Sequence, residues 1–240
     1  MREISTWRNP YGEGFSTCRP KKIKIESGLT VLVGCNGAGK TTLLNNIKQD
    51  LKDNSVPVLS FNNLTDGGSH GLSSAAYNED WSTLAMMTCS SEGETIGINI
   101  SRWIQGVRSF IANGFYCADT KEERFMNIFR YQDELIEKRK LLSKHKERWI
   151  LLDAVDSGYS IDNVIELKDV FNLIIEDAKT FDKEVYIIIS ANEYELANGE
   201  QCFDVNSGKY LTFKDYEDYK EFILKRREKK NKRYEKLQNR

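Results

Sequence analysis

The sequence predicts an α/β domain built on a mostly parallel sheet with helices on its faces. Four short apolar runs have the length of buried strands, and amphipathic helical patterns follow two of them. The chain has 240 residues, of which 40% are hydrophobic and 30% charged, as is ordinary for a folded domain. Strands that alternate with helices favour parallel pairing, with the helices packed on the sheet.

The four apolar runs are short and rich in aliphatic residues, and small or polar residues follow each of them. This pattern is typical of strands buried on both faces. The predicted strands are 29–33, 56–61, 149–152 and 185–189. Apolar residues at helical spacing predict helices over 41–51 and 163–181.

The two ends of the domain indicate antiparallel pairing. Ile23 and Ile25 alternate with charged residues, and 3–7 is a short polar-apolar stretch, so we expect half-exposed antiparallel strands beside the main sheet. Near the other end, 201–205 and 209–213 flank a turn sequence that predicts a hairpin.

We expect one domain over 1–213, followed by a C-terminal helix with a basic tail over 214–240. A charge-rich stretch predicts one or two surface helices, as a helical insertion over about 113–148. In the C-terminal helix a stripe of apolar residues indicates core packing. The stripe consists of Tyr216, Tyr219, Phe222 and Ile223.

The charge of the chain is unevenly distributed. Lys225–Arg240 carries nine basic and two acidic side chains, about +7, which leaves about −8 on the rest because the whole chain has −1. Two interpretations stay open for the tail: a solvated terminal helix, or a contact with nucleic acid such as DNA, an anionic surface or an acidic protein partner.

The cysteine spacing argues against a zinc site and a disulfide framework. The five cysteines form no CxxC pair, and their number is odd. No run of 18 apolar residues and no apolar leader occurs. We therefore expect a cytoplasmic protein without membrane insertion.

A glycine-rich loop follows the first predicted strand of the main sheet. It fits the pattern GxxxxGK[ST] completely, and Lys40 opens the predicted helix. Glycines let the backbone curl until its N–H groups point at phosphate oxygens, and a helix N-terminus adds partial positive charge. The residues assigned here to nucleotide binding are Gly34, Cys35, Asn36, Gly37, Ala38, Gly39, Lys40, Thr41 and Thr42.

This loop is a P-loop, and it predicts a P-loop NTPase fold with ATP and Mg²⁺ as cofactors. Lys40 would contact the β- and γ-phosphates, and the Thr41 hydroxyl would ligate the magnesium ion. The strand 149–152 is followed by Asp153, whose carboxylate would complete the metal site. A turn or helix-cap role is the alternative for Asp153.

The loop sequence resembles that of the ABC-type ATPases, especially the soluble heads of the SMC and RecF group, whose loops have the form GxNGxGK[ST]. Ser90-Ser91-Glu92-Gly93-Glu94 is similar to the family's signature, and Ser160-Ile161-Asp162 is similar to its D-loop. Asn192 stands where the family has a switch histidine. These elements occur in family order, but about fifty residues between the P-loop and Ser91 leave no room for coiled-coil arms.

The resemblance implies a head-to-tail homodimer that sandwiches ATP. Ser91, Gly93 and Glu94 of one subunit would close over the γ-phosphate in the P-loop of the other, with Asp162 nearby. Hydrolysis would release the dimer.

The sequence departs from the family at the catalytic positions. Ala154 stands where the family has the glutamate that positions the attacking water, and Asp156 is the candidate replacement. We therefore expect slow hydrolysis, because loss of a positioned base lowers rates by about 10²–10⁴. The catalytic set is Lys40, Asp153, Asp156 and Asn192. The family's glutamine after the second strand has its nearest equivalent in Asn62 or Asn63, and its stacking aromatic in Tyr11 or Phe15.

The leading hypothesis is a Mg-dependent ABC-type ATPase that works as an ATP-driven dimer, with a DNA-associated process suggested by the resemblance and the tail. The alternative from another class is a catalytically weak ATP sensor that recruits a partner, which Ala154 and Asn192 favour. A nucleotide-binding subunit of a membrane transporter is a further alternative. The short segment before Ser91 argues against it.

Overall fold

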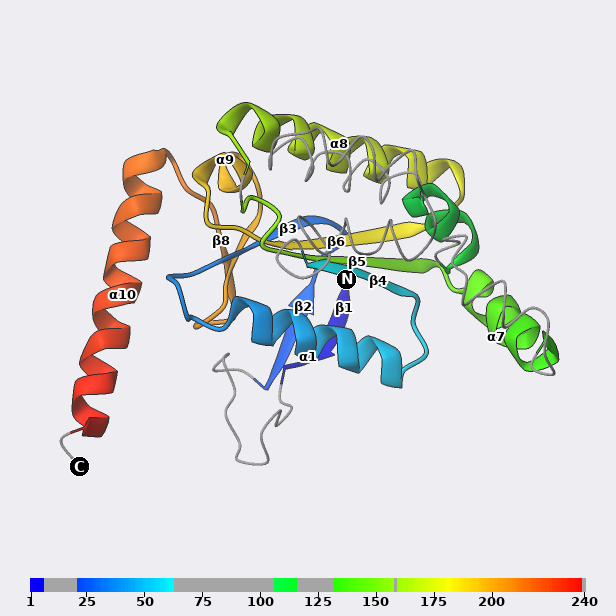
Figure 1. Cartoon of the computed structure of the whole chain (residues 1–240), viewed down its shortest axis with the longest axis horizontal. Helices are drawn as coiled ribbons and strands as arrows, with labels where there is room; N and C mark the ends of the chain where they lie inside the picture. Colours follow the sequence, from blue (N-terminus) through cyan, green and yellow to red (C-terminus); the bar gives the residue numbers. More distant parts are fainter. Residues whose placement is uncertain (7–20, 63–105, 116–131, 158, 239–240) are drawn as a thin grey trace, which may run out of the picture.

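A six-stranded sheet forms the centre of the protein, with helices on both of its faces (Figure 1). This computed structural model describes residues 1–6, 21–62, 106–115, 132–157 and 159–238. In order across the sheet, the strands are β4 (Val58–Asn62), β5 (Glu147–Asp153), β6 (Glu184–Ser190), β3 (Gly28–Val33), β7 (Cys202–Asp204) and β8 (Lys209–Leu211). All neighbouring pairs are parallel except β7 with β8. The predicted parallel sheet is confirmed, and so is the C-terminal hairpin.

Two long helices cover the opposite faces of this sheet: α1 (Lys40–Asp53) and α8 (Ile161–Thr180) (Figure 1). Both helices were predicted within three residues at each end. Successive strand residues alternate between the two cores, as the pleat requires. Ile150 belongs to the cluster beneath α8, whereas Trp149 belongs to the cluster with α1 and stacks on Tyr186 at a ring distance of 4.2 Å.

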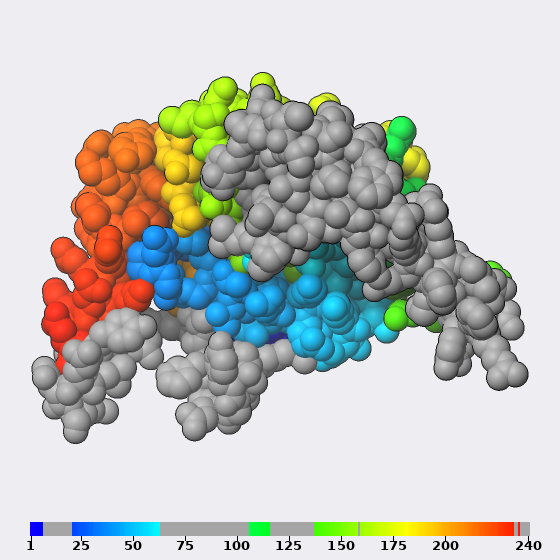
Figure 2. Space-filling model, in the orientation of Figure 1, coloured from blue at the N-terminus to red at the C-terminus, as the bar shows by residue number. Residues whose placement is uncertain are grey.

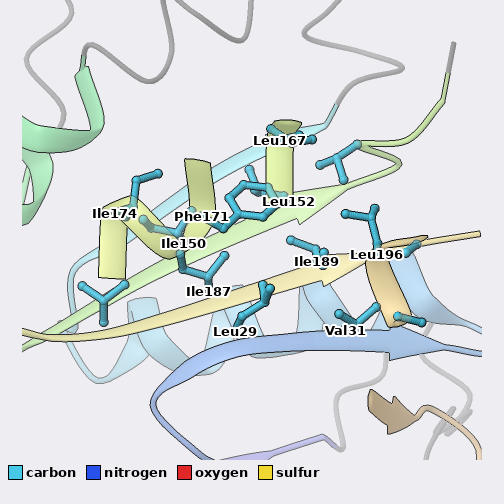
Figure 3. Packing of buried hydrophobic residues seen from close by; sticks show 14 of the residues in the cluster. Leu29, Val31, Ile150, Leu152, Leu167, Phe171, Ile174, Ile187, Ile189 and Leu196 are labelled. Atoms are coloured by element: carbon cyan, nitrogen blue, oxygen red, sulfur yellow. The ribbon is translucent and has the colours of Figure 1, made fainter. Parts of the chain in front are cut away.

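Apolar side chains of α8 point onto the sheet (Figure 3). Phe171 lies over the strand residues Ile150 and Leu152, and all three belong to one buried cluster. Burying a large apolar side chain of this kind contributes about 1.5–3 kcal/mol. The packing therefore fixes α8 on the sheet, and with it the segment that leads from β5 into α8.

A separate antiparallel sheet pairs β1 (Arg2–Ser5) with β2 (Lys22–Ile25). Ile4, Ile23 and Ile25 point into the cluster shared with α1, while the other residues of the two strands stay at least partly exposed. The predicted antiparallel strands beside the main sheet are thus confirmed.

Within the described ranges, the remaining helical segments are 106–113, α7 (Gln132–Lys144), α9 (Tyr194–Ala197) and α10 (Tyr216–Gln238). Within the range predicted as an insertion the structure describes α7, and β5 begins at Glu147. In α10, Tyr219 is buried in the cluster beneath α8, with Phe222 and Ile223 packed against it. Tyr216 is exposed, but its ring and that of Tyr194 form a T-shaped pair. No helix in the described ranges has both the length and the apolar character needed to cross a membrane.

Candidate functional site

The loop 34–39 joins the central strand β3 to α1. Gly37 and Gly39 have φ of 71° and 98°, a left-handed backbone that glycine adopts without steric strain. Gly39 is the residue before α1, and no side chain caps the helix at that position. The first turn of α1 also lacks an acidic residue. Its N–H groups and partial positive charge are therefore suited to an external anion.

Lys40 places its ammonium group beside this loop. Its Nζ donates hydrogen bonds to the Gly34 carbonyl and to Asn192 Oδ1, both at 3.0 Å. Burial lowers the pKa of Lys40, while Asp156, Cys35 and Asp153 act in the opposite direction. Lys40 and Asn192 were both predicted site residues, and the fold brings them together across 152 residues of sequence.

Asp153 ends β5 at the same edge of the sheet. Its Oδ1 accepts a hydrogen bond from the Ser190 hydroxyl at the end of β6. Its Oδ2 accepts one from Asn62 Nδ2 at 3.3 Å, since Asn62 is its register partner in β4. Ligands of parallel α/β sheets bind at the carboxyl ends of the strands, where these side chains meet.

Asp156 lies on the loop after β5 and is only 5% exposed. Its Oδ2 accepts hydrogen bonds from the backbone N–H groups of Asn192 and Glu193, the latter at 2.7 Å. Its Oδ1 is buried and has no hydrogen-bond partner within the described part of the chain. Asp156 thus holds the segment that carries Asn192 through Oδ2, while Oδ1 accepts no hydrogen bond from the described residues.

Ala154, between these two acids, has a left-handed backbone with φ of 54°. An L-residue with a Cβ pays roughly 1–2 kcal/mol in this conformation. Its N–H donates to the Ser190 hydroxyl at 2.9 Å. Ser190 therefore holds both Asp153 and the bend that follows it.

The structure also places the other predicted residues. In the loop, Cys35 and Ala38 are buried, whereas Asn36 and Gly37 are exposed. Thr41 is exposed at the first turn of α1, and Thr42 is half-buried. Asp162 is exposed at the first turn of α8, where a hydrogen bond from Ser160 lowers its pKa. The predicted residues that lie outside the described ranges are Tyr11, Phe15, Asn63, Ser91, Gly93 and Glu94.

The donor set at this edge of the sheet fits a magnesium ion bound together with a nucleotide. Mg²⁺ typically takes one or two carboxylates together with water and phosphate oxygens. Asp153 offers a carboxylate that two donors orient, and Thr41 offers an exposed hydroxyl. Among the described residues, no cluster of three or more His, Cys, Asp or Glu could hold a metal by itself.

Sequence reasoning missed several side chains that contact this site. Ser190 follows an apolar run with no motif of its own, and Asn206 lies in the β7–β8 turn with its Nδ2 3.4 Å from the Ala38 carbonyl. Lys230 of α10 donates to the Asn36 carbonyl at 2.7 Å. Only the tertiary fold reveals these contacts, because each residue is distant in sequence from the segment that it touches.

Comparisons with known proteins found similar chains among solved structures. No family model and no curated protein matches the chain. Among solved structures, the chain is similar to cbiO1 from Clostridium perfringens, described as part of the ABC transporter complex cbiONQ. The identity is 17% and the TM-score 0.42, with 87% of this chain and 86% of that chain covered. A likeness of this size assigns neither a family nor a function.

Proposed function

We propose that this chain binds ATP with Mg²⁺ and hydrolyses it slowly, as an ABC-type P-loop ATPase of the kind found in the SMC and RecF heads. The observation that carries the proposal is the meeting of three groups at one edge of the sheet. These are the uncapped N-terminus of α1, the Lys40 ammonium group, and the oriented Asp153 carboxylate. An anion and a cation bound together, as in Mg·ATP, match this combination.

Each loop residue has a role in this proposal. Backbone N–H groups of 34–41 hold the phosphates, and Lys40 neutralises their charge. Thr41 and Asp153 hold the magnesium ion, Thr41 through its hydroxyl and Asp153 through its carboxylate. The ion neutralises the charge that develops on the phosphate oxygens during transfer. Ser190 and Asn62 keep Asp153 oriented for that task.

We expect slow turnover because Ala154 stands where the family has its catalytic glutamate. An alanine cannot accept a proton, and its left-handed backbone lies directly after Asp153. Asp156 is the proposed substitute base, because its Oδ1 is buried without a partner among the described residues. Its other oxygen already holds the backbone at Asn192 and Glu193, so Asp156 has a positioning role as well.

Two Asp156 variants separate these roles. Asp156→Asn keeps an acceptor for the two backbone N–H groups but removes the base, so turnover should fall about 10²-fold with little change in ATP affinity. Asp156→Ala should also weaken ATP binding, since the segment beside Lys40 loses its anchor. If Asp156→Asn hydrolyses ATP at the wild-type rate, Asp156 is not the base. Ala154→Glu should raise turnover, and an unchanged rate would contradict the empty-base hypothesis.

The proposal includes an ATP-driven homodimer in which Ser91, Gly93 and Glu94 close over the partner's nucleotide. Its support is the signature-like sequence and its order relative to the P-loop. The mass of wild type in solution should double when ATP and magnesium are added. The Ser91→Arg variant should keep the mass of a monomer under the same conditions. A wild-type mass that is unchanged by ATP would refute the dimer.

The central test is calorimetry with ATP and magnesium on wild type and Lys40→Ala. We expect binding for wild type and a loss of at least about 100-fold for the variant, because a buried charge contact to phosphate is removed. If neither protein gives a heat of binding with ATP and magnesium while both are folded, the proposal is refuted.

A second candidate is an ATP sensor without useful turnover, which Ala154 and Asn192 favour. Phosphate release from wild type that does not exceed that from Lys40→Ala, together with normal ATP binding, would select the sensor. A DNA partner is proposed on the family resemblance together with the basic tail. Removal of 225–240 without any loss of DNA binding would show that the tail is not the DNA contact.

A further inference from the structure

The C-terminal helix α10 contacts three separate segments of the candidate site. Tyr219 donates its hydroxyl hydrogen to the Asn192 carbonyl at 2.7 Å. Arg226 forms an ion pair with Asp204, and Lys230 donates to the Asn36 carbonyl at 2.7 Å. In the space-filling view, the orange-to-red surface of α10 accordingly lies against the blue surface around the loop (Figure 2).

A buried ion pair fixes α10 in this position. Asp204 ends β7, is fully buried, and pairs in register with Val33, the last residue before the loop. Besides Arg226, its carboxylate accepts the Ser207 hydroxyl at 2.6 Å. Removing Arg226 would leave the buried Asp204 carboxylate without its cation, so the pair holds α10 at the end of β7.

Lys230 lies directly on the exposed turn of the loop. A Cβ built on Gly37 would come within 2.5 Å of Lys230 Nζ, closer than real Cβ contacts allow. The φ of 71° at Gly37 favours glycine, whereas the flexible tip of Lys230 could move aside from a Cβ. The ammonium group of a half-buried lysine is therefore seated against the backbone of the phosphate loop.

We propose that Lys230 is a second phosphate-binding cation of this site, supplied in the same chain by α10. The inference rests on the proposed function, since it assumes a nucleoside triphosphate in the loop. The triphosphate carries several negative charges. The ammonium group of Lys230, which lies against the loop that would hold the phosphates, attracts these charges. Lys40 approaches the loop from the side of Asn192, whereas Lys230 approaches from the side of Asn36.

The contact with a carbonyl oxygen leaves Lys230 able to act on the ligand. The hydrogen bond to the neutral Asn36 carbonyl does not neutralise the positive charge of the ammonium group. An attraction between charges persists without direct contact and weakens with added salt. The expected signature is thus an affinity that depends on the charge of residue 230 and on the number of phosphates.

The test is calorimetry of the full chain with Mg·ATP and Mg·ADP at low and high salt. Lys230→Gln should bind ATP about fivefold more weakly than wild type, with a smaller loss for ADP. The difference should shrink at roughly 0.5 M salt. Lys230→Arg keeps the charge and should bind within about twofold of wild type.

Lys229→Gln is the matched control, because it removes the same charge from an exposed neighbouring position on the same helix. It should leave ATP affinity within about twofold of wild type, and its thermal midpoint without nucleotide should equal that of Lys230→Gln. If Lys230→Gln binds ATP as well as Lys229→Gln does, the inference is wrong. Tighter ATP binding by Lys230→Gln would also overturn it, since Lys230 would then obstruct the loop.

The failure of this inference is distinct from the failure of the proposed function. If wild type binds no ATP, or if Lys40→Ala binds it equally well, both proposals fall. If wild type binds and Lys40→Ala does not, the P-loop function stands, and the Lys230 variants decide the second cation alone.

Discussion

The Ser190 hydroxyl links the Asp153 carboxylate to the backbone of the residue that follows it. It donates to Asp153 Oδ1 and accepts the N–H of Ala154 at 2.9 Å. One side chain at the end of β6 therefore orients both the proposed metal ligand and the bend beside it. Mutation of groups that orient a metal ligand in this way typically lowers metal affinity or activity by about 10–100-fold.

We expect Ser190→Ala to weaken magnesium affinity about tenfold, because Asp153 loses a donor that fixes its orientation. The measurement is ATP turnover or ATP binding as a function of magnesium concentration. Ser60→Ala is the control, since it removes a hydroxyl group from the neighbouring strand β4. Equal magnesium dependence of the two variants would show that Ser190 does not orient Asp153.

Ala154→Gly should leave the free energy of unfolding unchanged or raise it by up to about 1 kcal/mol. Glycine relieves the left-handed strain at φ of 54°, which offsets its greater entropy in the unfolded chain. Urea denaturation measures the change. The control is Ala178→Gly inside α8, which should lose about 1 kcal/mol or more. A loss at Ala154 as large as at Ala178 would contradict the strain.

Arg148→Met should lower the free energy of unfolding by about 3 kcal/mol. Arg148 is fully buried, and its side chain donates to backbone carbonyls, including those of Ile111 and His145 at 2.7 Å. Burial lowers its pKa to about 10, so the fold already disfavours the charge, yet the carbonyls depend on its donors. Denaturant unfolding is the measurement.

Arg108→Met is the comparison for this variant. Arg108 is 72% exposed and pairs with Asp177 at 3.2 Å, so its replacement should change stability by less than about 0.5 kcal/mol. Similar changes in the free energy of unfolding for the two variants would mean that water replaces the hydrogen bonds from Arg148 to the backbone carbonyls.

The stability of the protein should fall at alkaline pH partly through Cys202. Burial raises the pKa of this thiol from 9.0 to about 12. The unfolded chain releases the proton above pH 9.0 while the folded protein keeps it, so this contribution is complete below pH 9.0 and is lost as pH rises toward 12. Between pH 8 and pH 10, wild type should lose about 1 kcal/mol more than Cys202→Ala. Parallel pH profiles of the two proteins would exclude this contribution.

The sequence was sufficient for the parts of the fold that depend on local patterns. Apolar runs predicted the four long parallel strands, and 3.6-residue periodicity predicted α1 and α8. The glycine pattern with a lysine predicted the loop, because backbone N–H groups can converge only when several residues lack side chains. Asp153 was predicted from its position at the end of a strand.

Contacts between distant segments could not be predicted in this way. Arg148 was included in a charged surface stretch, and this was wrong, since it is a buried residue of β5. Ser190 and Lys230 contact the site through tertiary packing, and neither has a residue spacing that would indicate the contact. Asn62 was one of two candidates, and only the register of β4 on β5 brings it beside Asp153.

The position of β3 in the sheet has a consequence for synthesis on the ribosome. β3 leads into the phosphate loop, but both of its neighbours, β6 and β7, belong to the last quarter of the chain. A nascent chain therefore exposes both edges of β3 until Ser190 has left the exit tunnel, and one edge until Asp204 has left it. During that interval the strand is open to chaperones or to misassembly.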